Sequence, residues 1–158
     1  MLYIVKGVDE VKYRKATIDD LDQLIRFRKK QLIDEGIEPS INIDEELKDF
    51  FIKKLADETL VQWVVETDGE IIASGGIVFY DFPPSYTNKT GKKGYITNMY
   101  TKEEHRGKGI ATKMLTKLVD EAKERGISKI WLGASTLGRP VYKRYGFKET
   151  DEWLELNL

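Results

Sequence analysis

The sequence contains no cysteine and a single histidine, His105, in 158 residues. The lack of cysteine excludes disulfide bonds, thiolate metal sites and a cysteine nucleophile. The single histidine excludes a multi-histidine metal site and leaves His105 as the sole imidazole available for acid–base chemistry. Because cysteine-free chains fit a reducing compartment, we expect a cytoplasmic location, and we expect no metal cofactor.

Long apolar runs and an excess of one sign of charge are also absent. No apolar stretch approaches the roughly 18 residues of a transmembrane helix, and Met1–Glu10 lacks the basic start and apolar core of a signal peptide. The formal net charge is −1, whereas a nucleic-acid-binding face requires a basic excess. We therefore expect neither a membrane nor a nucleic acid as partner.

The composition that is present is that of an ordinary globular protein, with 41% hydrophobic and 34% charged residues. A chain of this length folds as one domain and buries about two-thirds of its unfolded surface. We predict a single domain over residues 1–158, in which residues 1–12 form either an extra strand or a tail. The pattern leaves open whether the protein is a monomer or a homodimer.

Hydrophobic periodicity and turn signals predict alternating groups of strands and helices. The predicted strands are Tyr13–Ala16, Leu60–Glu66, Glu70–Phe79, Tyr95–Thr101, Ser128–Ala134 and one or more within Phe147–Leu158. The predicted helices run from Thr17 to Gly36, from Asn42 or Asp44 to about Leu55, from about Gly107 to Arg125, and from Pro140 to about Tyr145. This order predicts an α+β fold, often filed as α/β, with a single mixed, mostly antiparallel twisted sheet flanked by helices.

The most informative segment is H-R-G-K-G-I-A-T, from His105 to Thr112. Gly107 and Gly109 let the backbone adopt unusual dihedral angles and approach a ligand closely. An apolar helical stripe follows, so the glycines precede a helix N-terminus with unpaired N–H groups. Because Arg106 and Lys108 oppose the helix dipole there, the pattern indicates an anionic ligand, and a phosphate or pyrophosphate fits best.

Two other phosphate-binding motifs match this segment poorly. A Walker-type loop requires G-x-x-x-x-G-K-[ST], but Lys108 lies between the two glycines. A dinucleotide fingerprint requires a small residue where Thr112 stands, and an acidic residue at the end of the next strand, where the chain reads Gly133-Ala134-Ser135. An NAD-dependent oxidoreductase is therefore a rival hypothesis that this segment does not favour.

The segment instead resembles the acyl-CoA pyrophosphate loop, R-x-x-G-x-[GA], of the GNAT superfamily of N-acetyltransferases. Arg106, Gly109 and Ala111 occupy the specified positions. Further along, Val141–Phe147 resembles the Φ-Y-x-x-x-G-F segment of the family, and its distance from Arg106 fits the usual spacing. The resemblance covers the chain from about Tyr13 to its end and implies the GNAT-type acyl-CoA N-acyltransferase fold.

The resemblance implies acetyl-CoA as co-substrate. In this fold the strand Tyr95–Thr101 separates from Ser128–Ala134, and its backbone pairs with the pantetheine arm as with an added strand. A backbone N–H near Met99 or Tyr100 would stabilise the tetrahedral oxyanion. The implied cofactor-binding residues are Met99, Tyr100, Thr101, Arg106, Gly107, Lys108, Gly109, Ala111, Thr112, Ser135 and Arg139. Ser135 replaces an asparagine of many relatives, and for Arg139 an exposed position at a helix start is an equal alternative.

Tyr142 is the implied catalytic residue, because the family places a tyrosine here to protonate the departing CoA thiolate. Ordinary pKa values of about 8.5 for a thiol and about 10 for a phenol permit this transfer in a desolvated site. Packing in the core is the competing role for Tyr142. The general base is not carried over, since the position of the glutamate that relatives use is Tyr95 here. Glu66, Asp81 or a chain of waters is left for that role, or the amine binds directly in its neutral form.

The sequence therefore predicts an acetyl-CoA-dependent N-acetyltransferase in which the amine attacks directly, without a covalent enzyme intermediate. The expected acceptor is a primary amine of a small molecule or a peptide, and its identity stays open. The alternative is a non-catalytic CoA-binding sensor or interaction module that has the same loop.

Overall fold

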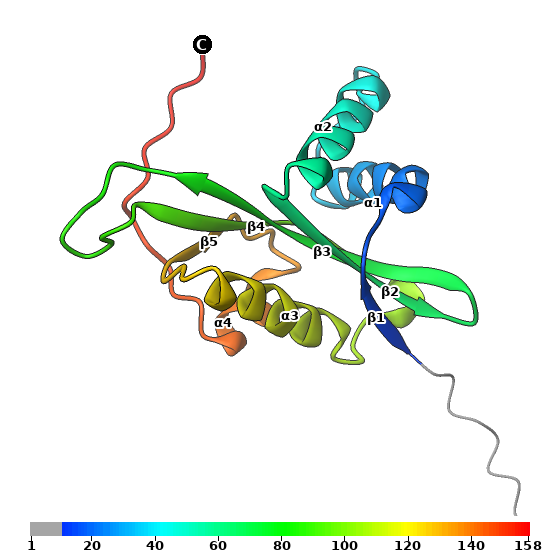
Figure 1. The fold of residues 1–158 in the computed structure, drawn as a ribbon. Coiled ribbons are helices and arrows are strands. Elements are labelled where there is room, and N and C mark those ends of the chain that lie inside the picture. The colour runs from blue at the N-terminus through cyan, green and yellow to red at the C-terminus, as the bar shows by residue number, and fades with distance from the viewer. Residues whose placement is uncertain (1–10) are drawn as a thin grey trace, which may run out of the picture.

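The computed structural model describes residues 11–158, so the prediction for residues 1–12 falls almost entirely outside it. Within the described range, five strands form one sheet in the order β1-β2-β3-β4-β5 (Figure 1). They are β1 (Lys12–Lys15), β2 (Leu60–Thr67), β3 (Glu70–Asp81), β4 (Lys92–Thr101) and β5 (Ile130–Leu132). The first four pair antiparallel and β5 pairs parallel with β4, which confirms the mixed, mostly antiparallel sheet.

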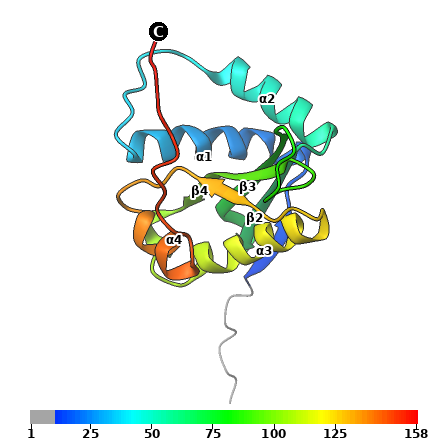
Figure 2. The same cartoon turned by 90° about the vertical axis from the view of Figure 1, so that its left-hand side faces the viewer.

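Helices cover both faces of the sheet (Figures 1 and 2). On one face lie α1 (Leu21–Asp34) and α2 (Asp44–Ala56), and on the other lie α3 (Ile110–Glu124) and the short α4 (Arg139–Tyr145). Two short 3₁₀ turns, η1 (Ile18–Asp20) and η2 (Glu103–His105), precede α1 and the loop before α3. The fold class predicted from the sequence is confirmed.

Each face of the sheet has its own apolar core. Successive side chains of a strand point to opposite faces, so the neighbours Val64 and Val65 of β2 are both fully buried but belong to different cores. The core under α1 and α2 consists of Leu24, Phe51, Leu60 and Val64. The larger core under α3 includes Val65, Ile72, Ile77, Met114, Leu115 and Leu118.

Local signals in the sequence set several boundaries. The β2–β3 hairpin turns at Asp68 and Gly69, whose φ values of 51° and 73° are the positive pair that a two-residue hairpin loop requires. α1 ends before Gly36, with φ of 84°, a common stop for a helix. α2 begins where the Asn42 side-chain oxygen accepts a hydrogen bond of 2.9 Å from the backbone N–H of Asp44.

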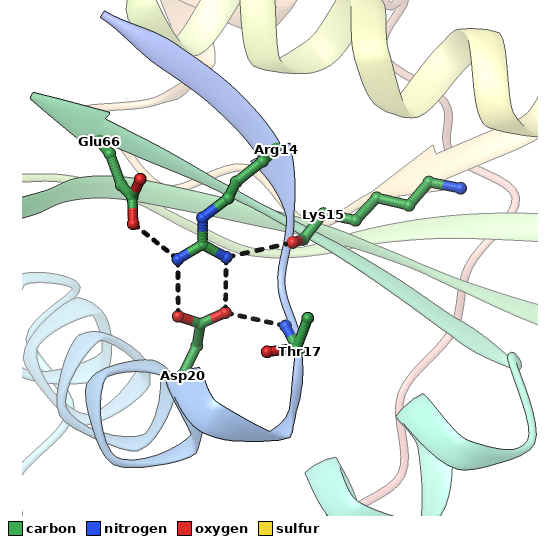
Figure 3. Close-up of polar contacts among 5 residues, drawn as sticks. All are labelled: Arg14, Lys15, Thr17, Asp20 and Glu66. Atoms are coloured by element: carbon green, nitrogen blue, oxygen red, sulfur yellow. Dashed lines mark hydrogen bonds and ion pairs between the residues drawn. The ribbon is translucent and has the colours of Figure 1, made fainter.

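An arginine on β1 fixes where α1 starts relative to the sheet (Figure 3). The two terminal nitrogens of Arg14 each donate a 2.8 Å hydrogen bond to one carboxylate oxygen of Asp20, and one of them also donates to Glu66 of β2 at 2.7 Å. Asp20 further accepts a 2.8 Å hydrogen bond from the backbone N–H of Thr17. Because Asp20 directly precedes α1, this cluster positions the helix over the sheet.

Several predicted boundaries are wrong: β4 begins at Lys92 instead of Tyr95, and α1 begins at Leu21 instead of Thr17. Two further differences lie next to the loop before α3 and on β5. α3 begins at Ile110 instead of about Gly107, because Gly107 and Gly109 have φ values of 74° and 79°, which no right-handed helix contains. The strand expected over Ser128–Ala134 is reduced to β5, Ile130–Leu132, since its pairing with β4 stops at Leu132.

The strand expected within Phe147–Leu158 is absent, and this segment has no helix or strand in the structure. A strand needs a neighbour for its backbone hydrogen bonds, and β5 offers an edge of only 3 residues. Trp153 still packs edge-on against Trp131 of β5, with ring centroids 4.8 Å apart. Beyond it, Leu154, Leu156 and Leu158 are exposed.

Candidate active site

The candidate site is a cleft that opens where β4 and β5 part. The two strands pair only from Gly94 to Ile96 on β4 and from Ile130 to Leu132 on β5. From Thr97 to Thr101, β4 continues with no partner on that side among the described residues. A cavity of about 390 Å³ lies against this segment. It is also lined by the end of α1, the loop before α3, and residues between Gly133 and Arg144.

A bulge at Asn98 shapes this part of β4. Between Gly76 and Ser74 of β3 there is one residue, whereas their partners Thr97 and Tyr100 are separated by two, so the register shifts. Asn98 has a φ of 56°, a left-handed conformation that asparagine tolerates better than most residues. Its amide donates to Gln62 at 3.3 Å, and its carbonyl accepts from the Ser74 hydroxyl at 3.4 Å. Such bulges redirect the backbone next to functional sites.

The glycine loop faces open space. A Cβ added at Gly107 or Gly109 would meet no atom within 4 Å, so these positions need glycine for their positive φ and not to avoid a clash. The first α3 backbone bond runs from the Lys113 N–H to the Gly109 carbonyl, at 3.1 Å. The N–H groups of Ile110, Ala111 and Thr112 therefore have no intrahelical acceptor, and all three residues line the cleft. This arrangement can bind an anion.

Arg106 ties the loop to two other walls of the cleft. Its Nε donates to the Thr101 carbonyl at 2.9 Å, and a terminal nitrogen donates to Asp34 at the end of α1 at 3.1 Å. Its guanidinium carbon lies 5.7 Å from the centre of the Tyr100 ring. The arginine thus joins β4, α1 and the loop, besides contributing positive charge next to the free N–H groups.

Tyr142 enters the cleft from α4. Burial raises the pKa of its phenol to about 12, and Glu35 and Tyr95 contribute smaller electrostatic shifts in the same direction. The ring packs edge-on against Phe147 at a centroid distance of 6.0 Å. Ser135 begins the turn before α4, where its hydroxyl oxygen accepts a 3.1 Å hydrogen bond from the Gly138 N–H. The raised pKa keeps the Tyr142 phenol neutral at physiological pH.

The structure brings most of the expected residues to one place. The following line the cleft: Met99, Tyr100, Thr101, Arg106, Gly107, Gly109, Ala111, Thr112, Ser135 and Tyr142. Lys108 and Arg139 are not among the lining residues. Arg139 instead donates a 2.7 Å hydrogen bond to Glu149 and lies half exposed. Sequence reasoning missed Gln31 of α1 and Glu35, the residue that follows α1, which also line the cleft, because no contiguous motif marks them.

The carboxylates considered as general bases lie elsewhere. Glu66 is paired with Arg14 of β1 at 2.7 Å, and Asp81 lies at the end of β3 opposite Lys92. Neither residue lines the cleft. Tyr95 is placed on β4 with its hydroxyl 3.1 Å from where a Cβ on Gly133 would lie. It borders a groove that continues from the cleft between α1 and β4.

The part of the chain that the structure describes has neither a metal-binding cluster nor a membrane-spanning helix. Residues 11–158 contain no group of three or more His, Asp or Glu side chains arranged to hold a metal ion. In the same range, no helix has both the length and the apolar character needed to cross a bilayer.

Comparison with known proteins identifies the class to which this fold and cleft belong. The model of the Acetyltransferase (GNAT) family matches residues 24–147, and the chain belongs to this family. It is therefore an acyltransferase, and the family supports acetyl-CoA as its co-substrate.

Individual relatives agree with this assignment. A crystal structure of a predicted acetyltransferase with acetyl-CoA from Clostridium acetobutylicum is 63% identical, with a TM-score of 0.92 over 94% of this chain and 96% of that one. A GCN5-related N-acetyltransferase from Ralstonia eutropha is 29% identical, with a TM-score of 0.87 over 94% and 99% of the two chains. A thialysine N-epsilon-acetyltransferase from Mus musculus is 23% identical, over 93% of this chain and 91% of its own length.

Proposed function

We propose that the protein transfers an acetyl group from acetyl-CoA to a primary amine by direct attack in a ternary complex. The observation that carries this proposal is the convergence of three features on one cleft. They are the unpaired stretch of β4, the N-terminus of α3 with its free N–H groups, and Tyr142.

The residues of the cleft suit the chemistry of a CoA thioester. The backbone of Met99, Tyr100 and Thr101 offers strand-type hydrogen bonds to the amides of the pantetheine arm, as in strand addition. The N–H groups after Gly109, with the positive end of the α3 dipole, suit the pyrophosphate. Arg106 adds positive charge beside them. The cleft fits a ligand with an extended amide arm and an anionic head group, and this supports acetyl-CoA over NAD.

The catalytic roles follow from where charge develops during the reaction. The acceptor nitrogen attacks the thioester carbonyl carbon, and a β4 N–H near Met99 or Tyr100 stabilises the resulting oxyanion. When the tetrahedral intermediate collapses, the C–S bond breaks and Tyr142 donates a proton to the CoA sulfur. Holding both substrates in one cleft supplies a large part of the rate, since the attack becomes effectively unimolecular.

The test is acetyl-CoA turnover against a panel of amines that includes amino acids, polyamines, amino sugars and peptides. We expect amine-dependent release of CoA thiol, with an acetylated product detected by mass spectrometry. Tight acetyl-CoA binding without transfer to any amine would support the sensor module instead. Binding of NAD in place of acetyl-CoA would contradict the proposal.

A further inference from the structure

A groove between α1 and β4 continues outward from the cleft. Gln31, Glu35, Thr97 and Ser135 line both the cleft and the groove, so the two spaces adjoin. A second, outer space adjoins the groove at Arg28, Tyr95 and Thr97. It lies under α2, where Leu47, Phe50 and Val78 contribute apolar lining. An acceptor that reaches the thioester from this side would lie along α1.

One face of α1, continued by Glu35 just after its end, gives this groove its charged groups. Arg28, Gln31 and Glu35 are spaced so that they lie on the same side of a helix, and all three line the groove. A 3.3 Å hydrogen bond joins Arg28 to the Gln31 oxygen, and a 3.1 Å bond joins the Gln31 amide to Glu35. Residues 28 and 35 are about two helical turns apart, or about 10 Å along the axis, and the Gln31 amide bridges their charged groups.

Glu35 marks the inner end of the groove. It lines the cleft together with Tyr142, and its charge is one of the influences that raise the pKa of that phenol. Its neighbour Asp34 is neutralised by Lys30 at 2.7 Å and by Arg106 at 3.1 Å. Among residues 11–158, by contrast, Glu35 has no cationic partner within ion-pair distance. It is the carboxylate in the cleft wall that a substrate ammonium can pair with.

Arg28 marks the outer end. It is half-buried, and within the described part of the chain its guanidinium bonds to Gln31 but to no carboxylate. Glu46 of α2 borders the same outer space but forms no ion pair with Arg28. Removing a guanidinium from water without an anion is unfavourable. Its planar fork matches a carboxylate, with two parallel hydrogen bonds.

We propose that the acceptor is a small molecule with a primary amine at one end and a carboxylate several bonds away. Glu35 binds and deprotonates the amine, and Arg28 binds the carboxylate. This inference rests on the proposed function, because it assigns the acceptor of the same reaction. The apolar side chains that line the groove itself, Ile96 and Leu137 among them, would contact the carbon chain between the two charged groups.

The proton balance uses groups already described. The acceptor ammonium first gives one proton to Glu35, and the neutral amine then forms the C–N bond. As the C–S bond breaks, Tyr142 gives its proton to the CoA sulfur. The second proton lost by nitrogen returns to the Tyr142 oxygen, and the proton on Glu35 leaves to solvent. The net products are the amide, the CoA thiol and one released proton.

A matched pair of probes tests the carboxylate. 6-Aminohexanoate and hexylamine have the same amine and the same chain length, but only the first carries a carboxylate. We expect the wild-type kcat/KM for 6-aminohexanoate to exceed that for hexylamine by about 10- to 100-fold, the value of a charge-assisted hydrogen-bonded pair. In Arg28→Gln this ratio should fall towards one. Lys29→Gln is the matched control, because Lys29 pairs with Asp44 outside the groove.

Glu35→Gln tests the inner end with Glu38→Gln as control, since Glu38 lies in the loop after α1 and lines neither cavity. We expect Glu35→Gln to lower kcat for both probes while the acetyl-CoA Kd and the melting temperature stay unchanged.

An equal kcat/KM for the two probes in the wild type, or an unaltered ratio in Arg28→Gln, would overturn the inference. If acetyl-CoA still supported transfer to other amines, the proposed function would stand. Failure of the wild type to bind acetyl-CoA would instead contradict both the proposed function and this inference.

Discussion

At the scale of single residues, the environment of Tyr142 decides what it can do. An ordinary phenol has a pKa of about 10, so a fraction of such side chains would be ionised in an alkaline assay. Burial raises the pKa of Tyr142 to about 12, which keeps the proton on the oxygen through the usual assay range. The sequence predicted the position of this tyrosine from a motif, whereas the shifted pKa depends on α4 packing against the cleft.

Tyr142→Phe removes one oxygen and keeps the ring that packs against Phe147. We expect kcat to fall by about 10²- to 10⁴-fold, the usual contribution of general acid catalysis, with an unchanged Kd for acetyl-CoA. Steady-state kinetics with a confirmed acceptor, together with calorimetric binding, measure the two quantities. Full kcat in the variant would show that Tyr142 serves packing alone.

At the scale of elements, the loop before α3 could be predicted from the sequence because all its determinants are contiguous. The separation of β4 from β5 depends on pairing between distant segments and on the bulge at Asn98, so no local pattern reveals it. The face of α1 that carries Arg28 and is continued by Glu35 was missed for the same reason. From the sequence alone, its polar residues would be interpreted as solvent-exposed, because only the folded structure shows that this face lies over the sheet.

Gly109→Asp tests the loop as an anion site. A carboxylate there faces the open space at the α3 N-terminus, and like charges brought together cost several kcal/mol. We expect acetyl-CoA to bind more than about 100-fold more weakly. Gly109→Asn is the matched control, since both side chains tolerate a positive φ and differ in charge. Similar Kd values for the two variants would mean that charge at this position is irrelevant.

The Arg14 cluster ties α1 to the sheet, and Asp20→Asn tests its contribution. Hydrogen bonds to charged groups contribute about 1.5–3 kcal/mol, so we expect a loss of that size in the free energy of unfolding, measured with urea at neutral pH. Hydrogen bonding to Arg14 lowers the pKa of Asp20 below its ordinary 3.8. The stabilisation is therefore complete above pH 3.8 and is lost as pH falls through the lowered pKa.

The difference between the wild type and Asp20→Asn should accordingly shrink in acid. Asp19→Asn is the control, because Asp19 lies exposed on the same 3₁₀ turn. A difference that is independent of pH would show that the ion pair with Arg14 does not stabilise the fold. Equal losses in the two variants would assign the effect to the turn itself.

At the scale of the whole molecule, the cleft collects residues from segments that are far apart in the chain. The fold class and the order of elements could be predicted, because periodicity and turn residues are local signals. The strand expected within Phe147–Leu158 could not be judged locally, since it depends on whether β5 offers an edge. Within residues 11–158, no extended strand partners β4 beyond β5, so the cleft walls come from α1, β4, the loop and α4.

Because these walls come from both helical layers, a ligand in the cleft should stabilise the entire fold. Acetyl-CoA that binds the native state alone adds about 2.7 kcal/mol at 100 times its Kd. For a chain of this size that corresponds to a rise of about 5–10 °C in melting temperature. Differential scanning fluorimetry with acetyl-CoA, CoA, NAD and ATP measures it, and the rise should vanish in Gly109→Asp. A rise with NAD or ATP, and none with acetyl-CoA or CoA, would contradict the assignment of the cleft.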